Sequence, residues 1–235
     1  MERKLERVPV MIVTAAGAVV AYLLRSIQLA TQIDATGRFV VGAGKGPLTW
    51  SALILILASA GYAFLLSSRE EMPCSSLPAM ILTLAAAFFT ALGSISAWKL
   101  SPVVALGCVG TAVCWVILAL RRQQGAQPHA LLFMIPALFT AVELIIKFRD
   151  WSRDPLLLDY CFELFAAIFI MFATYHLGGF SLGRAHRRRS VFYCMGGIMF
   201  SAVAVAGSSL LTAMPLVGAM LWLMANLWLL LSEAE

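Results

Sequence analysis

The chain has 235 residues, of which 61% are apolar and only 12% are charged, and its formal net charge is +5. A soluble domain usually carries about a quarter charged residues, because its surface must be hydrated. The composition therefore excludes a water-soluble globule. No long polar stretch leaves room for a separate soluble domain either, so we treat residues 1–235 as a single integral membrane domain.

Apolar runs of roughly 20 residues divide the chain, which is the length an α-helix needs to cross a bilayer. Proline favours the first turn of a helix, and seven prolines stand where such a run begins: Pro9, Pro47, Pro78, Pro102, Pro128, Pro155 and Pro215. The sequence thus predicts an all-α, polytopic transmembrane bundle of about eight helices. Their predicted spans are 9–30, 48–67, 78–97, 102–120, 129–147, 155–177, 190–211 and 214–231.

The last apolar stretch is the least regular part of this pattern. Residues 191–231 are almost uninterrupted apolar residues, which is too long for a single crossing even with tilt. The Gly207-Ser208-Ser209 segment and Pro215 supply a break, and this predicts a hairpin of two helices. Seven helices is the alternative, if the last segment is re-entrant.

The distribution of positive charge predicts the orientation. Ten of the 17 Lys and Arg residues fall on the side of the N-terminus, and seven fall on the other side. Cytoplasmic loops carry the excess of Lys and Arg. We therefore expect both termini in the cytoplasm and the protein in the plasma membrane.

A basic cluster lies in the predicted loop 179–190, at Arg184, Arg187, Arg188 and Arg189. Such clusters attract anionic lipid headgroups. The same charges could instead only fix the topology, or bind a protein partner. Nucleic acid is not an expected partner, because no folded domain accompanies the charges.

Three predicted helices carry polar groups, all toward their outer ends. A charge inside a membrane segment is costly and marks either function or a compensating pair. The groups follow helical spacing, so those of one helix share a face, as Glu143 and Lys147 do. The candidate ligand-binding residues are Arg25, Gln28, Gln32, Glu143, Lys147, Asp159 and Glu163.

The fifth and sixth predicted helices should pack antiparallel, because only a short turn joins them. This places Glu143 and Asp159 at similar depth, with Glu163 about 6 Å deeper. Two carboxylates that approach in a low-dielectric setting do not both stay ionised at low cost. Either one takes up a proton, or a cation such as Lys147, Arg25 or a bound ligand lies between them. Alternatively, the charges simply sit at tolerant helix ends.

Pro136 lies inside the fifth predicted helix, where it removes a backbone hydrogen bond and kinks the helix. A kink below an acidic residue suits a binding cavity. Asn226, in the last predicted helix, is expected to bond to a neighbouring helix.

These patterns favour small-solute or ion transport or binding through an outward-facing polar cavity between the first, fifth and sixth helices. The alternative is a membrane sensor or interaction subunit that acts through loop 179–190. An enzyme is less favoured: Gly179-Phe-Ser-Leu-Gly183 matches a nucleophile-elbow motif, but no strand precedes it. No metal-ligand spacing is present, and we expect no metal or cofactor.

Overall fold

The computed structural model describes residues 4–32, 76–126, 128–151, 157–184 and 186–231, and in addition residues 54, 56, 58 and 61. Within these residues every regular element is an α-helix, and seven of the helices are long and apolar enough to cross a membrane. The predicted all-α membrane bundle is therefore confirmed. Of the predicted helix over 48–67, only residues 54, 56, 58 and 61 are described, so the total of eight stays a prediction, as does the orientation.

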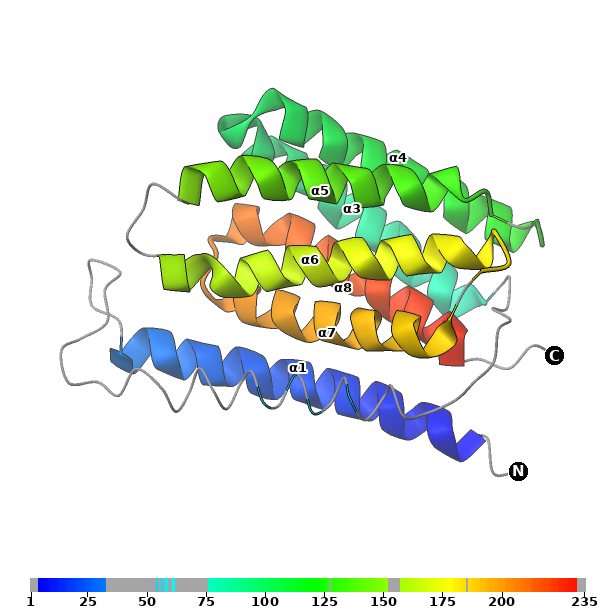
Figure 1. The fold of residues 1–235 in the computed structure, drawn as a ribbon, viewed down its shortest axis with the longest axis horizontal. Helices are drawn as coiled ribbons and strands as arrows, with labels where there is room; N and C mark the ends of the chain where they lie inside the picture. The colour runs from blue at the N-terminus through cyan, green and yellow to red at the C-terminus, as the bar shows by residue number, and fades with distance from the viewer. Residues whose placement is uncertain are drawn as a thin grey trace.

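The seven helices follow the predicted order with shifted ends. They are α1 (Lys4–Gln32), α3 (Leu77–Leu100), α4 (Pro102–Gln123), α5 (Leu131–Trp151), α6 (Leu157–Phe180), α7 (Arg187–Ala206) and α8 (Leu210–Leu231). The axes of all seven helices lie roughly along the long axis of the molecule. The start of α1 and the end of α8 lie at the same end of the bundle (Figure 1).

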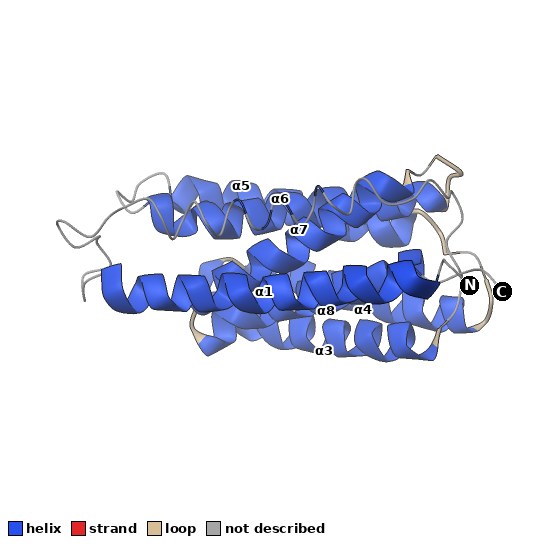
Figure 2. Ribbon diagram, turned by 90° about the horizontal axis from the view of Figure 1, so that it is seen from below, coloured by secondary structure: helices blue, strands red, loops and turns tan. Residues whose placement is uncertain are grey.

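Six of these helices form a closed ring. Each of the helices α3 to α8 contacts the next one along the chain, and α8 packs against α3, which closes the ring. Helix α1 lies outside, against α7 and the edge of α8, and it is the nearest helix to the viewer in Figure 2. The ring has an interior that α1 does not line.

Two helices begin as their prolines predict. Pro78 and Pro102 stand in the first turns of α3 and α4, where a missing N–H leaves no gap in the hydrogen bonding. The preceding serines are N-caps: the Ser76 hydroxyl accepts from the Ala79 N–H at 3.3 Å, and the Ser101 hydroxyl accepts from the Val103 N–H at 3.3 Å.

Helices α1 and α8 begin a few residues before the starts predicted from Pro9 and Pro215, although the membrane-spanning part of α1, Val10–Thr31, agrees with the predicted span 9–30. Helix α1 begins at Lys4, because the Lys-Leu-Glu-Arg segment before Pro9 consists of good helix formers. Pro215 is the sixth residue of α8, where its missing N–H leaves the Leu211 carbonyl without its helical donor. The hydroxyl of Ser96, on α3, lies 2.9 Å from that carbonyl and 2.9 Å from the Gly93 carbonyl of its own helix, so its single proton is divided between the two acceptors.

The predicted hairpin at the end of the chain is confirmed, with its break a few residues earlier. Helix α7 ends at Ala206 and α8 begins at Leu210, instead of 211 and 214. The Thr212 hydroxyl donates to the Ser209 carbonyl at 3.0 Å, which helps to close the first turn of α8.

Glycines let the ring helices approach one another closely. A Cβ at Gly218 of α8 would overlap the Thr90 hydroxyl of α3, and a Cβ at Gly107 of α4 would overlap the Phe139 ring of α5. Small residues at helix contacts are the usual means of association in membranes, where no hydrophobic effect drives helices together. These contacts bring side chains of α3, α4, α5 and α8 to one interior.

Candidate functional site

A shared ion pair joins α5 to α6. The Lys147 ammonium nitrogen lies 2.7 Å from Glu143 Oε1, one helical turn away, and 2.6 Å from Glu163 Oε1 on α6. All three side chains are half-buried. Three of the seven predicted site residues are thus brought together. Of the two arrangements expected for neighbouring acids, a protonated acid or a shared cation, the structure shows the shared cation: Lys147 lies between Glu143 and Glu163.

The charges of this triad do not cancel. With both glutamates ionised, two negative charges face a single positive one, so the triad of Glu143, Lys147 and Glu163 carries a net charge of −1. Removing charges from water is costly unless they are compensated. The triad therefore favours a proton, a cation or hydrogen-bond donors beside its carboxylates.

The triad lies at the wall of a cavity inside the ring. The cavity offers about 60 Å³ to the centres of water-sized molecules, enough for several waters or a small solute. Its walls come from α3, α4, α5, α6 and α8. From the triad it reaches Thr90, Thr111 and Trp115, which lie near the middle of α3 and α4.

Two helices carry a proline at this cavity, Pro136 in α5 and Pro215 in α8. A proline inside a membrane helix is tolerated where other groups satisfy the freed backbone. In α8, the Ser96 hydroxyl lies 2.9 Å from the Leu211 carbonyl, which Pro215 leaves without its helical donor. Two helices of the cavity wall thus each lack one backbone hydrogen bond.

Three buried polar atoms at the cavity have no hydrogen-bond partner among the described residues: Thr90 Oγ1, Thr111 Oγ1 and Trp115 Nε1. These residues are only 4%, 6% and 3% exposed. Buried polar groups are normally paired, so an unpaired group calls for an explanation. Sequence reasoning missed all three, although Cys108, Thr111 and Trp115 share the spacing of one helical face.

Arg25 and Gln28 lie on α1 and do not line this cavity. The Arg25 guanidinium donates to the Gln28 side-chain oxygen at 2.8 Å and stands 5.3 Å from the centroid of the Phe162 ring. Both side chains are buried. The side chains of Gln32 and Asp159 lie outside the described residues, so the seven-residue site as a whole stays a prediction.

A second buried cation lies where α4 ends. Arg122 donates to the Asn226 side-chain oxygen of α8 at 2.9 Å, and its guanidinium stands 5.7 Å and 5.8 Å from the Phe133 and Trp222 ring centroids. The predicted bond of Asn226 to a neighbouring helix is confirmed. No local pattern predicts that Arg122 is the partner, because the two residues are 104 positions apart along the chain.

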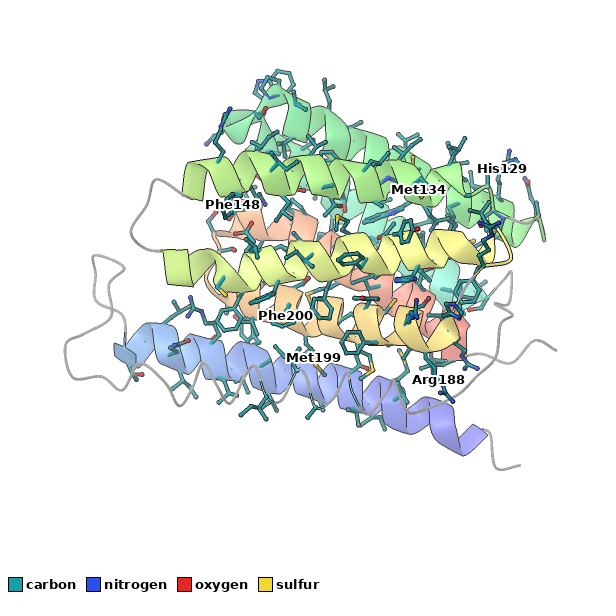
Figure 3. All side chains as sticks on the ribbon, in the orientation of Figure 1. His129, Met134, Phe148, Arg188, Met199 and Phe200 are labelled. Carbon is teal, nitrogen blue, oxygen red and sulfur yellow. The ribbon has the colours of Figure 1, made fainter. Side chains whose placement is uncertain are left out.

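The basic cluster lies at the start of α7. Its helix begins at Arg187 rather than at 190, so three of the arginines form the first turn. Arg184, Arg188 and Arg189 are exposed, and Arg187 is half-buried. Figure 3 shows Arg188 at the end of the bundle where α1 begins, and Phe148, which follows Lys147, toward the other end.

The Gly-x-Ser-x-Gly segment forms the C-terminal turn of α6. The Arg184 N–H donates to the Gly179 carbonyl at 3.0 Å, and Gly183 adopts a φ of 65°, which favours glycine. No strand precedes the segment among the described residues. The geometry of a nucleophile elbow is therefore not present there.

Comparison with known protein families, curated proteins and solved structures finds no match for this chain. The fold itself defines the class: the chain is an integral membrane protein, a bundle of helices around a cavity that the Glu143, Lys147 and Glu163 side chains help to line.

Proposed function

We propose that this protein binds a small polar solute or ion in the cavity of the helical ring and moves it across the membrane. The observation that carries the proposal is Lys147, held between Glu143 and Glu163 at a cavity wall inside membrane-spanning helices. Ionisable groups in such segments mark substrate or ion pathways when they face an interior.

Two further features support transport over a purely structural ion pair. The prolines inside α5 and α8 each remove one backbone hydrogen bond from a helix that lines the cavity. The cavity also contains buried hydrogen-bonding atoms that no described residue satisfies. A structural ion pair needs neither feature. The outward opening of the cavity is part of the proposal.

Uptake into proteoliposomes tests the proposal. The probes are Na⁺, K⁺, guanidinium, urea and nitrate, which sample both signs of charge and none. The wild-type protein should admit at least one probe faster than protein-free vesicles do. The triple variant Glu143→Gln, Lys147→Met, Glu163→Gln should reduce that uptake to the background, because it removes every charge of the triad and leaves no ion unpaired.

A substitution away from the triad supplies the control. Gln123→Ala alters an exposed neighbour of Arg122 and should leave uptake unchanged. Wild-type uptake no faster than that of protein-free vesicles, for every probe, would contradict transport.

A further inference from the structure

We infer that Thr90, Thr111 and Trp115 form a hydrogen-bonding subsite of the cavity for small uncharged solutes of the amide or urea type. The inference rests on the proposed function and names its substrate class. The triad and this subsite lie at one cavity, with the subsite near the middle of α3 and α4. Membrane transporters hold their substrates at comparable depth.

The two threonines differ from other threonines of the same bundle. A helical threonine normally satisfies its hydroxyl at the carbonyl four residues earlier. Thr83 does so at 2.7 Å, donating to Ala79, and Thr174 does so at 2.8 Å, donating to Ile170. Thr90 and Thr111 are equally helical, yet neither hydroxyl has a partner among the described residues. Their hydroxyls are therefore left for another hydrogen-bonding group.

Packing holds these hydroxyls in place. The Thr90 hydroxyl occupies the space left by the missing side chain of Gly218 on α8. A larger residue at position 218 would displace it. Neither hydroxyl reaches bulk water, since both threonines are more than nine-tenths buried. A group that pairs with them must enter the cavity.

Trp115 determines the polarity of the ligand. An indole N–H is a donor only, so its partner must offer an acceptor such as a carbonyl oxygen. The Trp115 ring is stacked on Trp222 at a centroid distance of 4.8 Å and an interplanar angle of 12°, which fixes its orientation. A ligand without an acceptor would leave the buried N–H unpaired.

The triad determines the charge of the ligand. With both glutamates ionised, its net negative charge at the same cavity disfavours an anion, and its carboxylate oxygens accept from N–H donors. A primary amide or a urea presents an acceptor oxygen on one side and N–H donors on the other. This chemistry matches both ends of the cavity without adding a charge.

Three planar probes of similar shape and different charge test this inference: urea, guanidinium and nitrate. Initial uptake into proteoliposomes should be fastest for urea. Thr111→Val and Trp115→Phe should each slow urea uptake about fivefold, the effect of losing roughly one buried hydrogen bond. Thr90→Val should act in the same direction. The matched controls Thr83→Val, whose hydroxyl is satisfied within its own helix, and Trp98→Phe, an exposed tryptophan, should leave uptake unchanged.

Thermal unfolding separates loss of the subsite from loss of the fold. Valine matches the shape of threonine, and Thr90→Val and Thr111→Val remove unpaired buried hydroxyls, so neither should lower the unfolding temperature. Uptake of guanidinium or nitrate faster than that of urea would overturn the inference. So would urea uptake that survives all three substitutions together, while the proposed function would stand in both cases. Wild-type vesicles that admit none of the probes would instead contradict the proposed function.

Discussion

Lys147 on α5 and Glu163 on α6 form an ion pair of 2.6 Å across two helices that pack side by side. The same ammonium holds Glu143 at 2.7 Å, so one cation serves two carboxylates. This contact both fastens α5 to α6 and sets the charge of the cavity. Its two roles are separable, because stability and solute uptake respond differently to removing one charge or all three.

Removing the shared cation alone should be destabilising. Lys147→Met leaves two carboxylates facing each other in a half-buried setting, and breaking such a pair costs about 3 kcal/mol. We expect a clear drop in the thermal unfolding temperature of the protein in detergent micelles.

Neutralising the two glutamates in the same variant should restore most of that stability, since no unpaired charge then remains. A Lys147→Met protein as stable as the wild type would show that the ion pair contributes nothing. A triple variant no more stable than Lys147→Met would show that charge is not the cause.

The Arg122–Asn226 hydrogen bond should contribute to stability at the other end of the ring. Asn226→Leu removes one hydrogen-bond acceptor of a buried guanidinium and should cost about 1–3 kcal/mol. Denaturation in detergent measures the effect, with Trp228→Leu, an exposed side chain two residues on, as the control. An equal loss of stability in Asn226→Leu and Trp228→Leu would show that the Arg122–Asn226 hydrogen bond does not contribute.

Part of the contribution of the Ser96 hydroxyl to stability should depend on Pro215, because this hydroxyl is shared between the Gly93 and Leu211 carbonyls. Ser96→Ala leaves the Leu211 carbonyl without its donor and should cost about 1 kcal/mol. Pro215→Ala returns a backbone N–H to that carbonyl, so the cost of Ser96→Ala should shrink in that background. Additive effects of the two substitutions on the unfolding temperature would contradict this coupling.

Gly218 and Gly110 form a matched pair for helix packing. An alanine at 218 would overlap the Thr90 hydroxyl, whereas one at 110 would meet nothing within 4 Å. Alanine favours a helix over glycine by about 1 kcal/mol. Gly110→Ala should therefore raise the unfolding temperature, and Gly218→Ala should lower it. The opposite order would mean that α3 and α8 are not in close contact at this point.

Local patterns predicted most of the fold. Apolar run length and first-turn prolines are properties of one segment, and they place the starts of α3 and α4 correctly. The first-turn rule fails for Pro215, which lies inside α8. The Leu211 carbonyl that Pro215 leaves without a helical donor is approached by Ser96, which is 115 residues from Leu211 along the chain. Likewise, nothing in the apolar pattern states that α1 packs on α7 rather than beside α5.

The residues of the candidate site also fall into those that a local pattern predicts and those that it does not. Glu143 and Lys147 are one turn apart, so their pairing follows from helix geometry, and antiparallel packing brings Glu163 to them. Thr90 and Thr111 are different, because an apolar run with a threonine normally means a hydroxyl bonded to its own helix. The Thr90 and Thr111 hydroxyls make no such bond among the described residues. This depends on how α3 and α4 pack against other helices, and no local sequence pattern predicts that packing.

Access to the triad tests most directly whether it faces a cavity that solutes reach or is a sealed structural ion pair. Thr140 lies at the cavity wall and is half-buried, and Val203 is fully buried in the core. In a background with the native cysteines replaced by serine, Thr140→Cys and Val203→Cys place one thiol at each position. The rate of labelling by a water-soluble thiol reagent, applied to proteoliposomes, is then compared. We expect the thiol at 140 to react much faster than the thiol at 203. Equal, slow labelling at both positions would contradict a solute-binding cavity and leave the triad as an internal fastening of α5 to α6.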